Sequence, residues 1–139
     1  MQITVESIQA STSISVLALE GELDGSNYQE VIAKSQELYH AGTRNIVLDL
    51  EKLRFMSSAG LVALHSVALI LGGEKPPDAE AGWNVFHTIG RERDANLGKQ
   101  QHLKLLKPQP KILSNLQKTG MDLVFDIFDD RVAALASFD

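Results

Sequence analysis

Residues Arg44 to Leu71 read RNIVLDLEKLRFMSSAGLVALHSVALIL. The run from Ile46 to Leu50 is apolar except for Asp49, which is typical of a strand covered on both faces. A short connection follows, in which Leu53 and Phe55 are expected to anchor the chain. Apolar residues then recur at helical spacing, and two glycines end the pattern. This stretch therefore predicts a buried strand, a short connection and a helix.

The helix is expected to open at Ser57 and Ser58. Serine is a favoured N-cap residue because its side-chain oxygen accepts a hydrogen bond from a backbone N–H of the first turn. The same helix end favours negative charge, so a phosphate on either serine would be tolerated there. The residues alone leave two interpretations open: the serines are only caps, or they are also modified.

Strand and helix patterns continue on both sides of this stretch. Residues 2–8 and 14–19 have the pattern of a strand hairpin, and Gly21 is expected to end its second strand. Ser26 and Gln29 are spaced as a capping box for the next helix. Beyond residue 101 we expect a strand over 102–106, a helix ended by Gly120, a short strand within 121–128 and a C-terminal helix after Asp129–Asp130. This alternation predicts an α/β sheet with one antiparallel hairpin strand.

Residues 73–101 interrupt the alternation with two prolines, four glycines and mixed charge. A connection of this length is uncommon inside a compact domain, so we interpret it as an insertion. Residues 74–82 have little apolar surface and are predicted to be mobile. Residues 83–89 contain Trp83 and Phe86 and are predicted to pack on the domain, because both rings in water would form an apolar patch.

Three short elements follow one another at fairly specific separations. Gly21–Asp24 reads GELD, Ile46–Leu50 reads IVLDL after an intervening helix, and Phe55–Leu61 reads FMSSAGL. Together they resemble the STAS domain family, named after sulphate transporters and anti-sigma-factor antagonists. The resemblance covers about residues 1–72 and resumes near Leu103. It implies a single domain over 1–139, with a STAS-like mixed sheet of about five strands, about four helices and a long insertion after the second helix.

The resemblance also implies a docking surface, because the GELD turn and the serine loop lie close together in this family. In its bacterial antagonists, a partner kinase phosphorylates the serine just before the glycine of a D-S-S-G motif. Ala59 stands at that position here and has no hydroxyl. The candidate phosphorylation sites are therefore Ser58 first and Ser57 second. The residues expected to bind the partner are Glu22, Asp24, Met56, Ser57, Ser58, Ala59, Gly60 and Leu61.

Composition limits the other classes of function. The 139 residues carry a net charge of −5, which argues against nucleic acid as the main partner. The nearest approach to a basic run is Lys104, Lys107 and Lys111, which is typical of a solvated surface. The absence of cysteine excludes disulfides, thiolate zinc sites and a cysteine nucleophile. The N-terminus does not resemble a secretory signal, and no apolar run is long enough for direct membrane insertion, so we expect a cytoplasmic protein.

No catalytic or metal-binding motif is apparent. The chain has no GxSxG elbow, Walker loop or dinucleotide loop, and its four histidines lack metal-ligand spacing. Glu20, Glu22 and Asp24 could form a cation site or a catalytic pair, although acidic residues at a strand end are more often solvated or capping. We therefore predict no catalytic residue, no metal and no cofactor.

Two functions follow from the resemblance. The favoured one is a non-enzymatic module in signal transduction and transcription regulation, similar to an anti-sigma-factor antagonist. It would act by partner switching with an anti-sigma factor or a serine kinase-like protein. The alternative is a STAS module of a transport or lipid-handling system that binds a small ligand or lipid.

Overall fold

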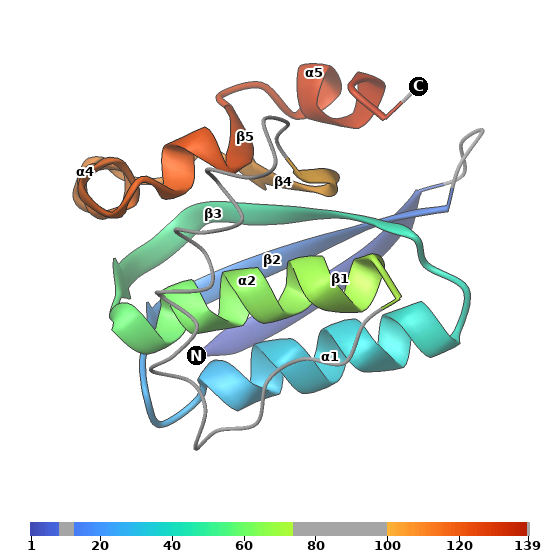
Figure 1. Ribbon diagram of the computed structural model, residues 1–139, viewed down its shortest axis with the longest axis horizontal. Helices are drawn as coiled ribbons and strands as arrows, with labels where there is room; N and C mark the ends of the chain where they lie inside the picture. Colours follow the sequence, from blue (N-terminus) through green and yellow to red (C-terminus); the bar gives the residue numbers. More distant parts are fainter. Residues whose placement is uncertain (9–12, 74–99, 139) are drawn as a thin grey trace.

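A five-stranded mixed sheet forms the centre of the protein, with helices on both of its faces (Figure 1). The computed structural model describes residues 1–8, 13–73 and 100–138. The strands are β1 Gln2–Ile8, β2 Ile14–Leu23, β3 Asn45–Met56, β4 Gln100–Leu106 and β5 Phe125–Phe128. The helices are α1 Tyr28–His40, α2 Ser58–Leu71, α4 Pro110–Thr119 and α5 Arg131–Ala136, with a 3-10 turn η2 at Met121–Leu123.

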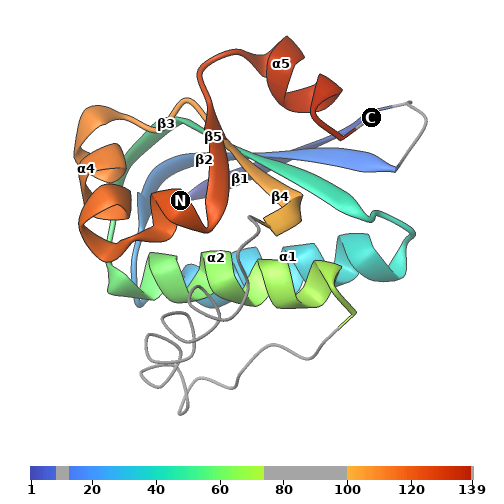
Figure 2. The same cartoon turned by 45° about the horizontal axis from the view of Figure 1, so that its top comes forward.

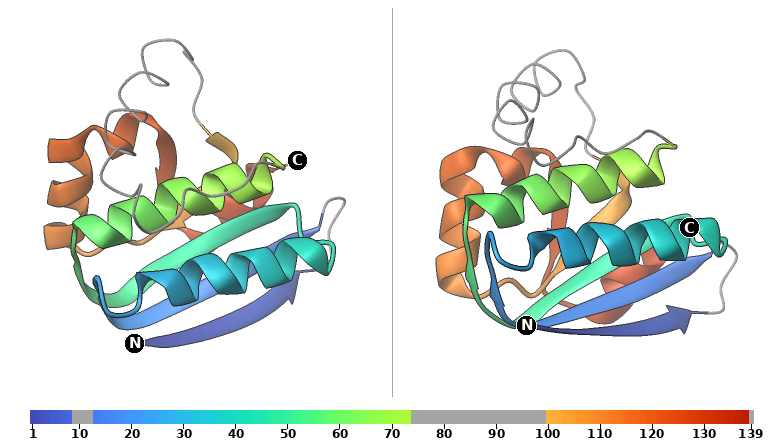
Figure 3. Two further views of the ribbon diagram at one scale, coloured as in Figure 1. Left: turned by 60° about the horizontal axis from the view of Figure 1, so that its bottom comes forward. Right: turned by 90° about the horizontal axis from the view of Figure 1, so that it is seen from below.

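The strands lie side by side in chain order. β1 pairs antiparallel with β2, whereas β2, β3, β4 and β5 run parallel to one another. The carboxyl ends of the parallel strands therefore meet at one edge of the sheet. Both views in Figure 3 show the starts of α1 and α2 at the same end of the molecule. The segments that carry the GELD and FMSSAGL elements are thus neighbours in space.

Helices bury both faces of the sheet, with α1 and α2 on one face and α5 on the other (Figure 2). On the first face Leu17 and Leu48 pack with Val31 of α1 and Leu64 of α2 in the main core. On the second face Ala134 of α5 packs with a smaller cluster formed by Ile14, Val16, Val47 and Leu106. Burial on both faces explains why the parallel strands are almost continuously apolar.

Helix α2 has no polar face. Even its two polar residues in the second half are buried, His65 at 3% exposure and Ser66 at 0%. The Ser66 hydroxyl is satisfied within the helix, because it donates to the Val62 carbonyl oxygen at 2.8 Å. A helix that is apolar on all sides is expected where the rest of the protein surrounds it. None of the described helices is long and apolar enough to cross a membrane.

The predicted fold class is confirmed: the described residues form a mixed α/β sheet of five strands with four α-helices, including the antiparallel hairpin strand. β5 lies within the predicted 121–128 range, and α5 begins after its N-cap Asp130, as the sequence indicated. β4 begins at Gln100, two residues earlier than predicted. The predictions for 74–82 and 83–89, and most of the proposed 73–101 insertion, lie outside the described residues.

The predicted ends of two strands are wrong. β2 does not end at Gly21 but continues to Leu23, because Gly21 adopts a φ of 107° next to an irregularity in the β2–β3 register. β3 likewise continues to Met56. Within this added length Leu53 is buried as expected, but Phe55 is 47% exposed and does not anchor the connection.

Candidate functional site

Two loops meet at the carboxyl edge of the sheet: the turn over residues 21–27 and the junction between β3 and α2. The parallel register of β2 and β3 places Glu22 beside Phe55 and Leu23 beside Met56. The Ser57 N–H then donates to the Leu23 carbonyl oxygen at 2.9 Å. Backbone pairing therefore fixes the turn directly against the first residues of α2.

Ser57 is the N-cap of α2, as the sequence predicted. Its backbone is extended, and its Oγ accepts a hydrogen bond from the Ala59 N–H at 3.2 Å. The Ser57 carbonyl oxygen also accepts from the Gly60 N–H at 2.9 Å. Ser58, the first helical residue, is exposed and makes no hydrogen bond through its hydroxyl with any described residue. One serine therefore holds the helix end while the next faces solvent.

Gly60 allows α2 to approach the ends of the two strands. A Cβ atom at this position would lie 2.3 Å from the Cγ of Met56 and 3.2 Å from two side-chain atoms of Leu23. Real Cβ atoms do not approach their neighbours this closely, so any larger residue would push the helix away. The glycine of FMSSAGL is thus required by packing beneath the serines.

Asp24 organises the turn. Its Oδ1 accepts hydrogen bonds from the Ser26 N–H at 2.9 Å and from the Ser26 hydroxyl at 2.5 Å. These bonds to Ser26 lower the pKa of the Asp24 carboxyl below its ordinary value, because they favour the charged form. Asn27 completes the turn, since its Oδ1 accepts from the Asp24 N–H at 3.0 Å and its Nδ2 donates to the Glu22 carbonyl oxygen at 2.8 Å.

This turn chemistry replaces the predicted capping box. Ser26 and Gln29 do not cap α1: the N-cap is Asn27, and it makes no side-chain cap bond to the helix. The physical reason is competition, because the Ser26 hydroxyl is already used by the Asp24 carboxylate. Asp24 was noted in the sequence, but its partner Ser26 was expected to cap α1.

The eight residues expected to bind a partner separate into a surface and a support. Glu22 and Ser58 are exposed, and Asp24, Ser57 and Ala59 are half-buried. Met56, Gly60 and Leu61 are buried, with 3% of Met56 and 4% of Leu61 exposed. These three lie beneath the surface formed by the other five.

The acidic residues of this region do not form a metal site. In the described ranges no group of three His, Asp or Glu side chains is arranged to hold a metal ion. Glu20 and Glu22 instead lie along β2, opposite Lys52 and Phe55 in the register with β3, while the Asp24 carboxylate turns to Ser26.

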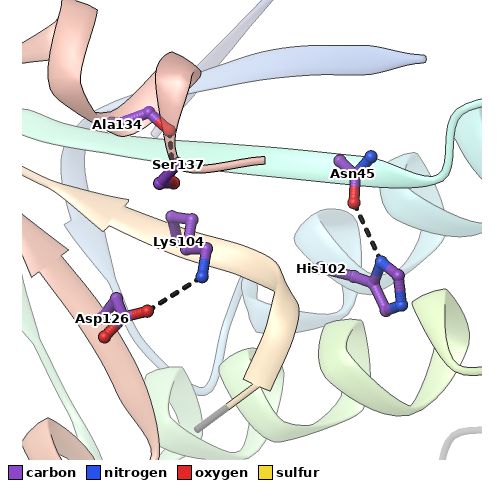
Figure 4. Close-up of polar contacts among 6 residues, drawn as sticks. All are labelled: Asn45, His102, Lys104, Asp126, Ala134 and Ser137. Atoms are coloured by element: carbon purple, nitrogen blue, oxygen red, sulfur yellow. Dashed lines mark hydrogen bonds and ion pairs between the residues drawn. The ribbon is translucent and has the colours of Figure 1, made fainter. Parts of the chain in front are cut away.

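A second polar cluster lies along β4 (Figure 4). The Lys104 ammonium is 2.8 Å from Asp126 Oδ2 and 5.6 Å from the centre of the Phe138 ring, and the side chain is 7% exposed. The expectation that Lys104 belongs to a solvated surface is therefore wrong. His102 Nδ1 lies 2.9 Å from Asn45 Oδ1. These contacts join β3, β4, β5 and the C-terminal segment and have a structural role.

One feature near the site was not found from the sequence. An open hollow of about 460 Å³ lies between the end of β3 and helix α4. Its lining includes Arg54, Phe55, Lys111 and Lys118. The two halves of this lining are more than fifty residues apart in the sequence. No local sequence pattern indicates such a convergence of distant segments.

The chain is similar in fold to several solved structures. An anti-sigma factor antagonist from Mycobacterium paratuberculosis is 18% identical, with 99% of this chain and 94% of that chain covered and a TM-score of 0.64. A candidate anti-sigma factor antagonist from Thermotoga maritima is 16% identical, with coverage of 96% and 93% and a TM-score of 0.67. The antagonist SpoIIAA in its unphosphorylated form is 20% identical, with coverage of 95% and 93% and a TM-score of 0.57.

No curated protein matches the chain. A family model described as "Mlab, STAS domain" matches residues 7–76, which is half of the chain and includes both loops of the site. The family match and the fold similarity agree with the motifs quoted above. The chain belongs to the STAS domain family.

Proposed function

We propose that this protein is a non-enzymatic regulatory module that binds a protein partner, in the manner of an anti-sigma-factor antagonist. Family membership and the descriptions of the similar structures support the proposal. The observation that carries it is the hydrogen bond from the Ser57 N–H to the Leu23 carbonyl oxygen. It makes one rigid surface from the acidic turn and the exposed start of α2, so binding would need little ordering.

The docking surface consists of Glu22, Asp24, Ser57, Ser58 and Ala59, and we name it the serine-turn surface. Met56, Gly60 and Leu61 support it from below, since all three are buried. The partner would be an anti-sigma factor or a serine kinase-like protein in the cytoplasm. Binding would occupy that partner and release its target, which is regulation by partner switching.

Phosphorylation is the expected control of such a surface. Ala59 stands at the acceptor position of the family and has no oxygen to attack a phosphoryl group. Ser58 is the better acceptor of the two serines, because it is exposed while Ser57 is engaged as the N-cap. A phosphate at Ser58 suits the start of a helix, yet a partner would have to desolvate it, so modification would break the complex.

The first experiment identifies the partner. The tagged full-length protein is used to capture proteins from a lysate of the native cells, and mass spectrometry identifies them. Incubation with the captured kinase-like protein and ATP, followed by peptide mapping, is expected to locate phosphate on Ser58. A phosphosite away from Ser57 and Ser58 contradicts the assignment. A small molecule or lipid bound to the purified protein, without a protein partner, supports the ligand-binding alternative.

The second experiment measures the affinity of the purified partner for variants of the serine-turn surface. Ser58→Asp is expected to weaken binding about tenfold, because the interface must desolvate a new charge. The variant should still fold, since a negative charge in the first turn favours the helix. Ser7→Asp is the matched control, because Ser7 is an exposed serine on β1. Equal affinity for both variants contradicts the proposed surface.

A further inference from the structure

We propose that the hollow between the end of β3 and α4 binds an acidic segment of the protein partner. This inference rests on the proposed docking function and adds a second contact beside the serine-turn surface. The side chains used are Arg54 and Phe55 of β3 with Lys111, Ser114, Asn115 and Lys118 of α4. We name this site the α4 hollow.

The α4 hollow has an unbalanced positive charge. Arg54, Lys111 and Lys118 are exposed, they make no ion pair with any described residue, and none of the described lining residues is acidic. Of the six other described cations, Lys34, Lys104, Lys107 and Arg131 each lie within ion-pair distance of a carboxylate. Arg44 instead donates to backbone carbonyl oxygens and lies over the Tyr39 ring, so only Lys52 resembles the cations of the hollow. In a chain of net charge −5, three unpaired cations around one hollow indicate a negatively charged partner.

The spacing of the cations favours an extended acidic segment. Lys111, Ser114, Asn115 and Lys118 are separated by three, four and seven positions and therefore share one face of α4. Lys111 and Lys118 are about 10 Å apart along the helix axis, at 1.5 Å per residue. In a peptide of polyproline II conformation, two carboxylates three residues apart point to the same side and are about 9 Å apart. A run of acidic side chains fits the whole stripe, whereas a single small anion fits only part of it.

The start of α4 adds to the positive potential at the Lys111 end. Helix N-termini carry partial positive charge, and the N-cap residue Gln109 makes no side-chain cap bond to the helix. Its amide nitrogen instead donates to the Glu51 carbonyl oxygen at 2.8 Å. The helix dipole therefore acts in the same direction as the lysines and is not offset by an acidic cap.

Phe55 gives the hollow an apolar element. Its side chain is 47% exposed, while Met56 and Ile112 beside it are buried and form the floor. An apolar residue of the partner would remove the ring from water, so the expected segment combines acidic residues with at least one large apolar residue. Phe55 is also the register neighbour of Glu22, so the α4 hollow adjoins the serine-turn surface.

The two surfaces are electrostatically opposite. The serine-turn surface contains Glu22 and the ionised Asp24, whereas the α4 hollow contains only cations among its charged lining residues. A partner that touches both must present a basic or neutral patch to the first and an acidic segment to the second. This opposite charge of the two surfaces would fix the orientation of the partner and disfavour proteins with a different charge pattern.

The test uses fluorescence anisotropy with the full-length protein and a labelled synthetic peptide of glutamate pairs separated by leucine. A second peptide with glutamine in place of every glutamate is the charge control. The protein is expected to bind the first peptide and not the second. The double variant Lys111→Gln with Lys118→Gln should weaken binding about tenfold, as expected for two exposed ion pairs. Added NaCl should weaken it further.

A charge-matched variant separates the hollow from net charge. Lys34→Gln with Lys52→Gln also removes two positive charges, and neither residue lines the α4 hollow. Peptide affinity should be unchanged in this variant. Equal loss in both double variants, or no binding of the acidic peptide by the unaltered protein, overturns the inference. Displacement of the peptide by inorganic phosphate or ATP, where NaCl of equal ionic strength has no effect, indicates a small-anion site and also overturns it.

This test is independent of the serine-turn surface, because the peptide assay needs no natural partner. If the peptide does not bind while Ser58→Asp still weakens the partner complex, the inference fails and the proposed function stands. If the peptide binds at the α4 hollow but the partner is insensitive to Ser58→Asp, the acidic site stands and the proposed docking surface is wrong.

Discussion

Ser57 and Ser58 are adjacent in the sequence but differ in what their side chains do. Ser57 Oγ accepts a hydrogen bond from the backbone of α2, and Ser58 is exposed at the same helix end. The sequence predicted the cap correctly because N-capping depends on a local pattern. It did not predict the use of Ser26 by Asp24, because a short acidic or hydroxyl side chain has several local backbone and side-chain partners to choose from.

The Asp24 turn has a measurable titration signature. The hydrogen bonds from Ser26 lower the pKa of Asp24 below 3.8, so their stabilising effect is present above that value and is lost as the pH falls through the lower, folded-state pKa. Ser26→Ala removes the hydroxyl bond and should move the pKa of Asp24 upward. Side-chain NMR titration measures both values. An Asp24 titration midpoint that does not move in Ser26→Ala contradicts the assigned cause.

Gly60 gives a packing prediction at the same scale. In Gly60→Ala the new methyl group would clash with Met56, and the overpacking should outweigh the helix propensity gained. We expect a loss of about 1–2 kcal/mol in the free energy of unfolding, measured with urea. Gly25→Ala is the matched control, because nothing lies within 4 Å of its Cβ position. Equal stability of the two variants would refute the packing account.

At the scale of elements, the sequence predicted the order and type of the strands and helices better than their ends. β2 and β3 continue past their predicted ends at Gly21 and Leu50 because their backbones pair with each other, and such pairing is not visible in either segment alone. Phe55 was expected to anchor the connection after the strand, but it is 47% exposed. The exposure of Phe55 depends on how α4 packs beside β3, because the two elements leave a hollow next to the ring. α4 is far from Phe55 in the sequence, so this exposure was not predictable from the local pattern.

An ion pair links β4 and β5 in addition to their backbone pairing. Lys104 and Asp126 are register partners, and the lysine is much more buried than the aspartate. Asp126→Ala would leave a buried ammonium without this carboxylate and should cost about 2–3 kcal/mol of unfolding free energy. Lys104→Met removes the charge that needs a partner and should cost less, about 1 kcal/mol or below. Urea denaturation of both variants measures the difference, and the reverse order of stability is inconsistent with this view.

At the scale of the whole molecule, alternating strand and helix patterns were enough to predict the sheet, its antiparallel edge and the helices that cover it. The resemblance to the STAS domain family, and not the periodicity, implied that the GELD turn and the FMSSAGL junction lie close together. What the patterns did not predict is the chemistry formed by contact between distant segments, such as Arg54 with Lys111 and Lys118 around one hollow. Such a site exists only after β3 and α4 have packed together.

The central claim is that a protein partner docks on the serine-turn surface. Hydrogen–deuterium exchange of the protein, alone and with its captured partner, tests this most directly. The account predicts that binding slows exchange at the amides of residues 21–27 and 57–60, while those of β1 and α5 are unchanged. Protection confined to β1 or α5, with the 21–27 and 57–60 amides exchanging as in the free protein, would contradict it.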